Sequence, residues 1–115
     1  MKDGLVVAGV GENGRDARDE GLAVSVVVPV YNEVESLPHL LAAISSSLAD
    51  AGLSYEIICV DDGSKDGSDR WLKSEALRRN DLRSVLLRRN YGQTAAMAAG
   101  FYYALYQSRR KIRPG

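Results

Sequence analysis

Residues 55–68 read YEIICVDDGSKDGS, an apolar run that stops at two adjacent carboxylates. The run Ile57–Val60 has no polar alternation, which is typical of a strand covered on both faces, as in a parallel sheet. Gly63 and Ser64 then turn the chain toward a helical pattern. Ligands of open α/β sheets bind at the carboxyl ends of the strands. Asp61 and Asp62 therefore stand where a small polar ligand is expected.

A second strand–helix unit precedes this stretch. Val24–Val30 is a valine-rich strand, with Pro29, which lacks an N–H, near its end. Ser36 is a candidate N-cap for the helix that follows, and Gly52 is placed to end it. Apolar residues recur at helical spacing on one face of this helix, at Leu37, Leu40, Leu41, Ile44 and Leu48.

The downstream chain continues the alternation. A second helix, capped by Asp66 or Ser68, ends near Asn80. Val85–Leu87 predicts a third strand, and the alanine-rich stretch 94–106 predicts a helix that is apolar nearly all round and therefore buried. The order β-α-β-α-β-α predicts an α/β fold, a Rossmann-like parallel sheet with right-handed crossovers.

Parallel strands end at the same edge of a sheet, and we call this edge with its loops the rim. The residues that follow Val30, Val60 and Leu87 are predicted to gather there. They are Tyr31, Asn32, Glu33, Asp61, Asp62, Ser64, Arg88, Arg89, Asn90 and Gly92.

The two aspartates allow two interpretations that spacing alone does not separate. Adjacent carboxylates accept hydrogen bonds from a base or ribose, or coordinate a hard cation. Alternatively one caps a turn, because aspartate next to glycine is common in turns, and the other is solvated. A calcium loop that starts at Asp62 is excluded, because its twelfth position is Lys73 rather than glutamate.

The loop after the third strand also allows two interpretations. Arg88 and Arg89 precede a helix that starts near Gly92, which predicts a diphosphate site at a helix N-terminus. The alternative is two exposed arginines. Tyr31 is suited to stacking on a base or to packing over the sheet end. The residues alone thus indicate a nucleotide-like or sugar-phosphate-like ligand.

The composition is that of one soluble globular domain, with 115 residues, 45% of them hydrophobic and 26% charged. Fifteen basic and fifteen acidic residues cancel, so the net charge indicates no particular partner, and we predict no nucleic-acid partner. Cys59 falls inside a predicted buried strand, which favours a structural thiol. No run approaches the ~18 apolar residues of a membrane helix. We expect a cytoplasmic protein without a transmembrane segment.

The two ends of the chain differ from its middle. Residues 9–14 fit the pattern G-x-G-x-x-G, but the charged run 15–20 that follows is no amphipathic helix, so we interpret the match as chance. We therefore predict a flexible leader at 1–21, a nucleotide-binding unit at 22–106 and a basic tail at 107–115.

Three motifs in this order resemble family 2 glycosyltransferases, most closely the dolichol-phosphate mannose synthase-like branch that forms polyprenyl-phosphate sugars. They are VPVYNE at 28–33, VDDGSxDGS at 60–68 and RNYGQTAA at 89–96. The resemblance spans about 24–104. Each motif alone is weakly specific, whereas the three in this order and spacing are highly specific.

The resemblance implies the N-terminal, nucleotide-binding half of a GT-A fold. It implies a nucleotide-diphosphate sugar as donor, polyprenyl phosphate as acceptor, Mg²⁺ or Mn²⁺ on the diphosphate, and a position against the cytoplasmic face of the membrane. By position, Asp61 would bind the base and Asp62 would lie near the ribose. The other implied nucleotide-sugar-binding residues are Pro29, Tyr31, Glu33, Arg89, Asn90, Gly92 and Gln93.

The chain departs from the family pattern after Ala104. Such enzymes carry an Asp-x-Asp metal motif after the third helix, yet the last acidic residue here is Asp81. The metal ligands are therefore missing from this chain, and we expect it to be a truncated transferase that is inactive alone. The alternative is a non-catalytic nucleotide-binding or interaction module with the same fold.

Overall fold

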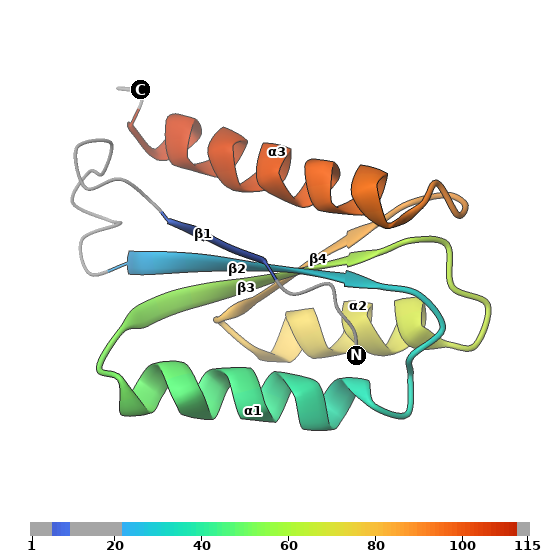
Figure 1. Cartoon of the computed structure of the whole chain (residues 1–115), viewed down its shortest axis with the longest axis horizontal. Coiled ribbons are helices and arrows are strands. Elements are labelled where there is room, and N and C mark those ends of the chain that lie inside the picture. The colour runs from blue at the N-terminus through green and yellow to red at the C-terminus, as the bar shows by residue number, and fades with distance from the viewer. Residues whose placement is uncertain (1–5, 10–21, 113–115) are drawn as a thin grey trace.

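The structure, a computed structural model, describes the chain at residues 6–9 and 22–112 (Figure 1). Strands and helices alternate after the first strand. The elements are β1 (Val6–Gly9), β2 (Leu22–Val30), α1 (Leu37–Asp50), β3 (Ser54–Asp61), α2 (Ser68–Arg78), β4 (Leu82–Leu86) and α3 (Gln93–Ile112).

The strands form one sheet in the order β1-β2-β3-β4. β3 pairs parallel with both β2 and β4, with Cys59 opposite Val28 on one side and Ser84 on the other. Helices α1 and α2 cover one face, and α3 covers the opposite face (Figure 1). This arrangement confirms the predicted α/β class and its three parallel strands, which end within one residue of the predicted positions.

Strand β1 lies in the segment that we predicted to be a flexible leader. Its four residues pair antiparallel with β2, Val6 opposite Val27 and Gly9 opposite Val24. The prediction was wrong for residues 6–9, because valines favour strands and the open edge of β2 offers unpaired backbone groups. Of the remaining leader, residues 1–5 and 10–21 lie outside the described part of the chain, and with them most of the G-x-G-x-x-G match.

The helix ends differ from the predicted caps. The Ser36 side chain makes no capping hydrogen bond; its hydroxyl donates to the Glu33 carbonyl at 3.3 Å. α2 is preceded by Gly67, which has a φ of 97° and serves as the N-cap in place of Asp66 or Ser68. Gly52 does follow α1 as predicted, with a φ of 74° and its N–H on the Ala49 carbonyl.

The third helix is longer and less buried than predicted. It continues to Ile112, so most of the predicted basic tail is helical, because glutamine, arginine and lysine are good helix formers. Ala96 is fully buried, whereas Tyr102 is 77% exposed. Small residues bring the inner face against the sheet: a Cβ on Gly100 would stand 2.3 Å from a Val27 methyl group. Because residues 94–106 are apolar on nearly every side of the helix, the sequence did not show which face packs on the sheet.

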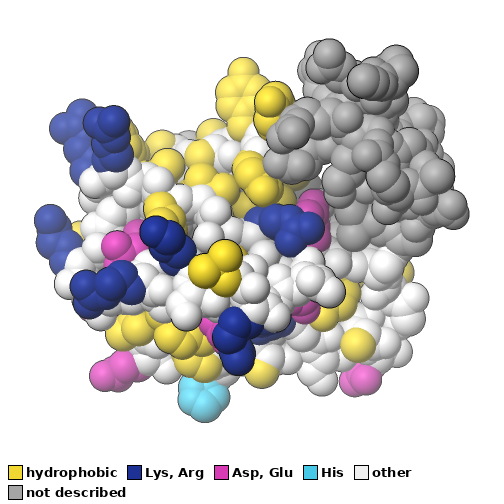
Figure 2. Space-filling model, turned by 180° about the vertical axis from the view of Figure 1, so that it is seen from behind, with side chains coloured by type: hydrophobic (Ala, Val, Ile, Leu, Met, Phe, Trp, Pro, Cys, Tyr) yellow, Lys and Arg dark blue, Asp and Glu magenta, His cyan; other side chains and the backbone are white. Residues whose placement is uncertain are grey.

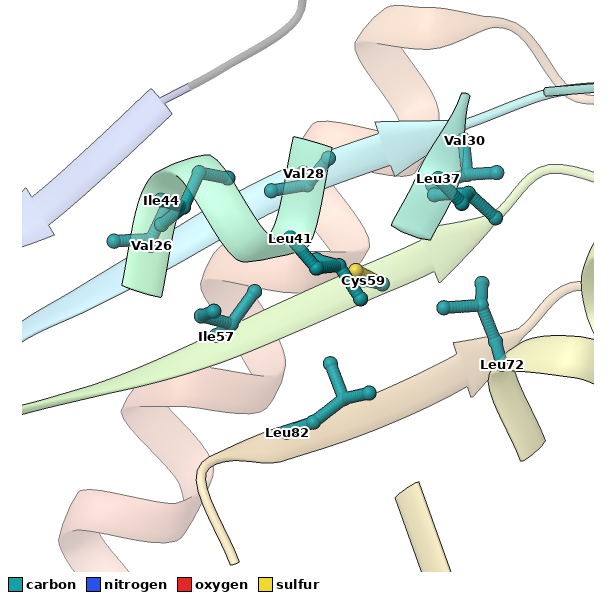
Figure 3. Close-up of a cluster of buried hydrophobic side chains, with 10 residues drawn as sticks. All are labelled: Val26, Val28, Val30, Leu37, Leu41, Ile44, Ile57, Cys59, Leu72 and Leu82. Carbon is teal, nitrogen blue, oxygen red and sulfur yellow. The ribbon is translucent and has the colours of Figure 1, made fainter. Parts of the chain in front are cut away.

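Two apolar layers enclose the sheet. Alternate residues of β2 and β3 pack against α1 and α2 on one face, in a cluster that contains Val26, Val28, Val30, Leu37, Leu41, Ile44, Ile57, Cys59, Leu72 and Leu82 (Figure 3). The smaller layer under α3 contains Val27, Ile58, Val60 and Ala96. Burial raises the pKa of the Cys59 thiol to about 12, which fits the predicted structural role.

A polar network stabilises the edge of the sheet opposite the rim. The Arg79 guanidinium donates to both Asp81 carboxylate oxygens, at 2.9 and 3.0 Å, and to the Ser45 hydroxyl of α1 at 3.0 Å. The Tyr55 hydroxyl donates to Asp81 at 2.9 Å. The hydrogen bond from Arg79 lowers the pKa of the Asp81 carboxyl below its ordinary value, partial burial opposes the shift, and the Tyr55 hydrogen bond adds to it.

We expect Asp81→Asn to lower the free energy of unfolding at pH 7 by about 1–2 kcal/mol. Because the pKa of Asp81 is lower in the folded than in the unfolded chain, its stabilisation is complete above the unfolded pKa of about 4 and is lost as the pH falls through the folded pKa. Urea unfolding across this pH range measures both effects. Asp50→Asn, at an exposed position of α1, is the control. A difference from wild type that persists unchanged below the folded pKa would contradict the assignment.

Candidate functional site

The rim carries three loops, at residues 31–36, 62–67 and 87–92, one after each parallel strand. Backbone pairing continues into them, because the Asp62 N–H donates to the Val30 carbonyl at 2.8 Å and the Leu87 N–H donates to the Asp61 carbonyl at 2.9 Å. Seen from behind, Lys and Arg side chains stand along the side of the molecule at which these strands end (Figure 2). The predicted gathering of the loops is thus present.

Asn32 and Ser64 join the first two loops. The Asn32 N–H donates to the Ser64 hydroxyl at 2.7 Å, and the Lys65 N–H donates to the Asn32 side-chain oxygen at 2.8 Å. Asn32 has a φ of 52°, a left-handed conformation that asparagine tolerates better than most residues. This conformation fixes the path of the chain directly after β2.

Asp66 and Ser68 join the same loops further along. The Val34 N–H donates to one oxygen of Asp66 at 3.1 Å, and the Glu33 N–H donates to the Ser68 hydroxyl at 3.1 Å. The other Asp66 oxygen accepts hydrogen bonds from the Ser68 hydroxyl and N–H. Desolvation would raise the pKa of Asp66, but the hydrogen bonds from Ser68 and Val34 lower it below its ordinary value. Asp66 therefore connects two loops and is not merely a turn residue.

Asp62 is bonded to the third loop. One carboxylate oxygen accepts the Tyr91 N–H at 2.7 Å, and the other accepts the Gly92 N–H at 2.9 Å and the Asn90 side-chain amide at 3.1 Å. The residue is only 3% exposed. A carboxylate thus lies beside the start of α3, where the sequence predicts a diphosphate site.

Gly63 allows the third loop to approach the second. It has a φ of 76°, and a Cβ at this position would stand 2.4 Å from the Arg89 carbonyl carbon and 2.5 Å from the Asn90 nitrogen. Both atoms belong to the backbone and cannot rotate away. The glycine of the DDGS motif is therefore required twice, for its conformation and for the space beside it.

Asp61 has an unused acceptor. Its Oδ2 accepts the Ser64 N–H at 2.9 Å, and the residue is 1% exposed. No donor within the described part of the chain reaches Oδ1, although that atom is buried. An unsatisfied buried acceptor costs about 1–3 kcal/mol, and more for a charged group, so this oxygen is the clearest place at the rim for a ligand's donor.

The other predicted site residues lie at the end of β2, in the loop after it, and in the third loop with the start of α3. Arg89 is exposed, and its guanidinium carbon lies 5.1 Å from the centre of the half-exposed Tyr91 ring, an arrangement typical of a cation–π contact. Tyr31 is also exposed, while Pro29 and Glu33 are half-buried. Asn90, Gly92 and Gln93 lie at the start of α3.

The sequence placed Asn32 and Ser64 at the rim, and Asp66 and Ser68 as helix caps, but it did not predict that these four side chains join the first two loops. A side chain that bonds its own turn and one that bonds a distant loop have the same local sequence pattern. The recurrence of short polar side chains in both loops was the available signal.

The described residues do not provide a metal site. Among them, no three His, Cys, Asp or Glu side chains form a group that could hold a metal ion. Asp62 already accepts three hydrogen bonds, so the donor set at the rim does not fit a bound divalent cation. Within residues 6–9 and 22–112, no helix has the length and apolar character needed to cross a membrane.

The buried carboxylates Asp61 and Asp62 lie at the carboxyl ends of the parallel strands, which is where open α/β sheets bind their ligands. Residues 25–107 match the family model described as Glycosyl transferase family 2, and the chain belongs to this family. The family resemblance inferred from the three motifs is thereby confirmed.

Among characterised proteins, the chain is similar to undecaprenyl-phosphate 4-deoxy-4-formamido-L-arabinose transferases. It is 49% identical over 79 residues to the protein of Aeromonas hydrophila and 51% identical over 79 residues to that of Klebsiella pneumoniae. Each match covers 68% of this chain and 24% of the relative. The chain thus spans about a quarter of the length of these relatives.

We expect Gly63→Ala to destabilise the chain more than Gly52→Ala. Both glycines have positive φ values, so both substitutions introduce backbone strain, but a Cβ at Gly52 meets nothing within 4 Å. The clash with the third loop should add about 1–3 kcal/mol to the loss for Gly63→Ala. Urea unfolding of the two variants measures the difference. Equal losses would show that the third loop does not press on Gly63.

Proposed function

We propose that this chain is the donor-binding part of a family 2 glycosyltransferase that transfers a sugar from a nucleotide diphosphate to polyprenyl phosphate. The family match over residues 25–107 supports the reaction class. The names of the similar proteins, which act on undecaprenyl phosphate, support the acceptor. Mg²⁺ or Mn²⁺ is expected with the donor, held by ligands that this chain does not supply.

The unsatisfied Oδ1 of Asp61 is the observation that carries the donor site. Nucleobases present N–H donors, and a buried carboxylate oxygen with no partner is a strong acceptor for one of them. Asp61 is covered in this structure, so we expect side chains at the rim to move when a ligand binds. The residues proposed to surround the nucleotide-sugar are Pro29, Tyr31, Glu33, Arg89, Asn90, Gly92 and Gln93.

The basic side chains of the third loop suit the diphosphate. Arg88 and Arg89 are exposed at the rim and have no carboxylate partner among the ion pairs of the described residues. Arginine binds phosphate oxygens through a planar fork of N–H donors. We propose that these arginines neutralise part of the diphosphate charge. We also propose that the protein lies against the cytoplasmic face of the membrane, where it meets the membrane-bound acceptor.

Asp61→Asn tests the donor site. The amide can keep its oxygen on the Ser64 N–H, but it then places an NH₂ donor where the base requires an acceptor. We expect the Kd for the preferred nucleotide-sugar to rise about 10–100-fold, as for the loss of a charged hydrogen bond.

The measurement is calorimetric titration with UDP-, GDP- and dTDP-sugars. Asp50→Asn, on the exposed surface of α1, is the matched control and should bind like wild type. An unchanged Kd in folded Asp61→Asn would reject Asp61 as a ligand. If wild type gives no heat with any of the three donors, the alternative of a non-catalytic interaction module is favoured.

We expect the 115-residue chain to bind the donor without transferring the sugar. Departure of the nucleotide diphosphate requires its developing charge to be neutralised, commonly by a metal ion held by carboxylates. The carboxylates of the rim are bonded to loop N–H groups, and the last acidic residue is Asp81. An assay with nucleotide-sugars, a polyprenyl phosphate and Mg²⁺ or Mn²⁺ checks this. Glycolipid formation that exceeds the level with an Asp61→Ala variant would contradict it.

A further inference from the structure

We propose that Asp62 is a positioning residue that holds the third loop of the rim in its binding conformation and does not contact the ribose itself. This inference rests on the proposed function, because the loop matters only if a nucleotide-sugar binds beside it. The resemblance to the family placed Asp62 near the ribose as a binding residue, so the two assignments make different predictions.

The hydrogen bonds of Asp62 leave little capacity for a ligand. A carboxylate has about four acceptor positions, and three are taken by the Tyr91 N–H, the Gly92 N–H and the Asn90 amide. A weaker contact, from the Asn90 amide to the Asp62 carbonyl at 3.3 Å, holds the same side chain. Because only 3% of the residue is exposed, the fourth position is shielded from solvent. A ribose hydroxyl would have to displace a loop amide to reach it.

The third loop, which Asp62 holds, carries the two arginines of the site, Arg88 and Arg89. Tyr91 lies under the Arg89 guanidinium at 5.1 Å, so the bond from Asp62 to the Tyr91 backbone also places this arginine. Gly63 presses against the Arg89–Asn90 backbone from the same strand end. Two consecutive residues after β3 thus fix the loop, one by hydrogen bonds and one by contact.

The hydrogen bonds to Asp62 also determine which groups of the third loop can bind a phosphate. The Tyr91 and Gly92 N–H groups point at Asp62 and are not available as a backbone cradle for an anion. The carboxylate also places a negative charge beside the positive end of α3, which favours the helix but not a diphosphate. The loop therefore contributes arginine side chains to the diphosphate, held in place by Asp62.

The test separates positioning from ribose contact by changing the protein and the ligand together. Of UDP and GDP, the nucleoside diphosphate that wild type binds more tightly is compared with its 2′-deoxy and 3′-deoxy forms, in wild type and in Asp62→Asn, by calorimetry. If Asp62 acts through the loop, the substitution raises the Kd for all three ligands by the same factor, roughly tenfold. If Asp62 bonds a ribose hydroxyl, the wild-type preference for the intact ribose disappears in the variant, and the proposal is overturned.

Amide hydrogen exchange without ligand provides an independent readout. We expect Tyr91 and Gly92 to exchange faster in Asp62→Asn, whereas amides at the centre of β3 keep their protection. Asn90→Ala, which removes one of the three bonds to the carboxylate, should show a smaller change in exchange and in Kd, and it serves as the test variant if Asp62→Asn fails to fold. Unchanged exchange at Tyr91 and Gly92 in a folded variant would overturn the proposal.

Asp50→Asn is the matched control in both measurements, because it removes the same charge from an exposed site on α1. The failure of this inference differs from the failure of the proposed function. If wild type binds neither nucleoside diphosphate, the donor site and the binding role of Asp62 both fail. If wild type binds and Asp62→Asn binds equally well, the donor site stands and only the positioning role is rejected.

Discussion

The parallel pairing of β3 with both of its neighbours is the constraint on which the rest of the structure depends. Because β2, β3 and β4 run the same way, their following loops start at one edge of the sheet. The polar side chains of the loops can then reach each other across more than 25 residues of sequence. Helices cover both faces of this sheet, which is why β3 is apolar at each position from Ile57 to Val60, directly before Asp61.

Two adjacent aspartates meet different environments at this edge because successive residues of a strand point to opposite faces. Asp62 packs against the third loop, and its carboxylate oxygens accept hydrogen bonds from that loop's N–H groups. Among the described residues, Asp61 accepts a single N–H, from Ser64 in the turn after β3, and its other, buried oxygen has no donor. Of the two adjacent aspartates, Asp62 is therefore bonded to the third loop, whereas Asp61 keeps an acceptor oxygen for a ligand. Gly63 permits both by letting the two loops come into contact.

Much of the fold could be predicted from local patterns. Valine-rich runs, helical spacing of leucines and the glycine after α1 located the elements, since each signal reflects the conformation of a few neighbouring residues. Strand β1 was not predicted, because its stability depends on the edge of β2 rather than on its own four residues. The exposed face of α3 was also missed, because alanines and aromatics on both faces are apolar. The burial of Ala96 and the packing of Gly100 on Val27 show which face lies inward.

The sequence by itself determined the class of fold, the three motifs that place the chain in its family, and the residues that gather at the rim. These follow from composition and order along the chain. Only the tertiary structure decided what each rim residue does, because hydrogen-bond partners of Asn32, Asp62 and Asp66 come from segments remote in sequence. A carboxylate looks the same in a sequence whether it is saturated by backbone N–H groups or left with a free oxygen. The packing of the loops around it makes that difference.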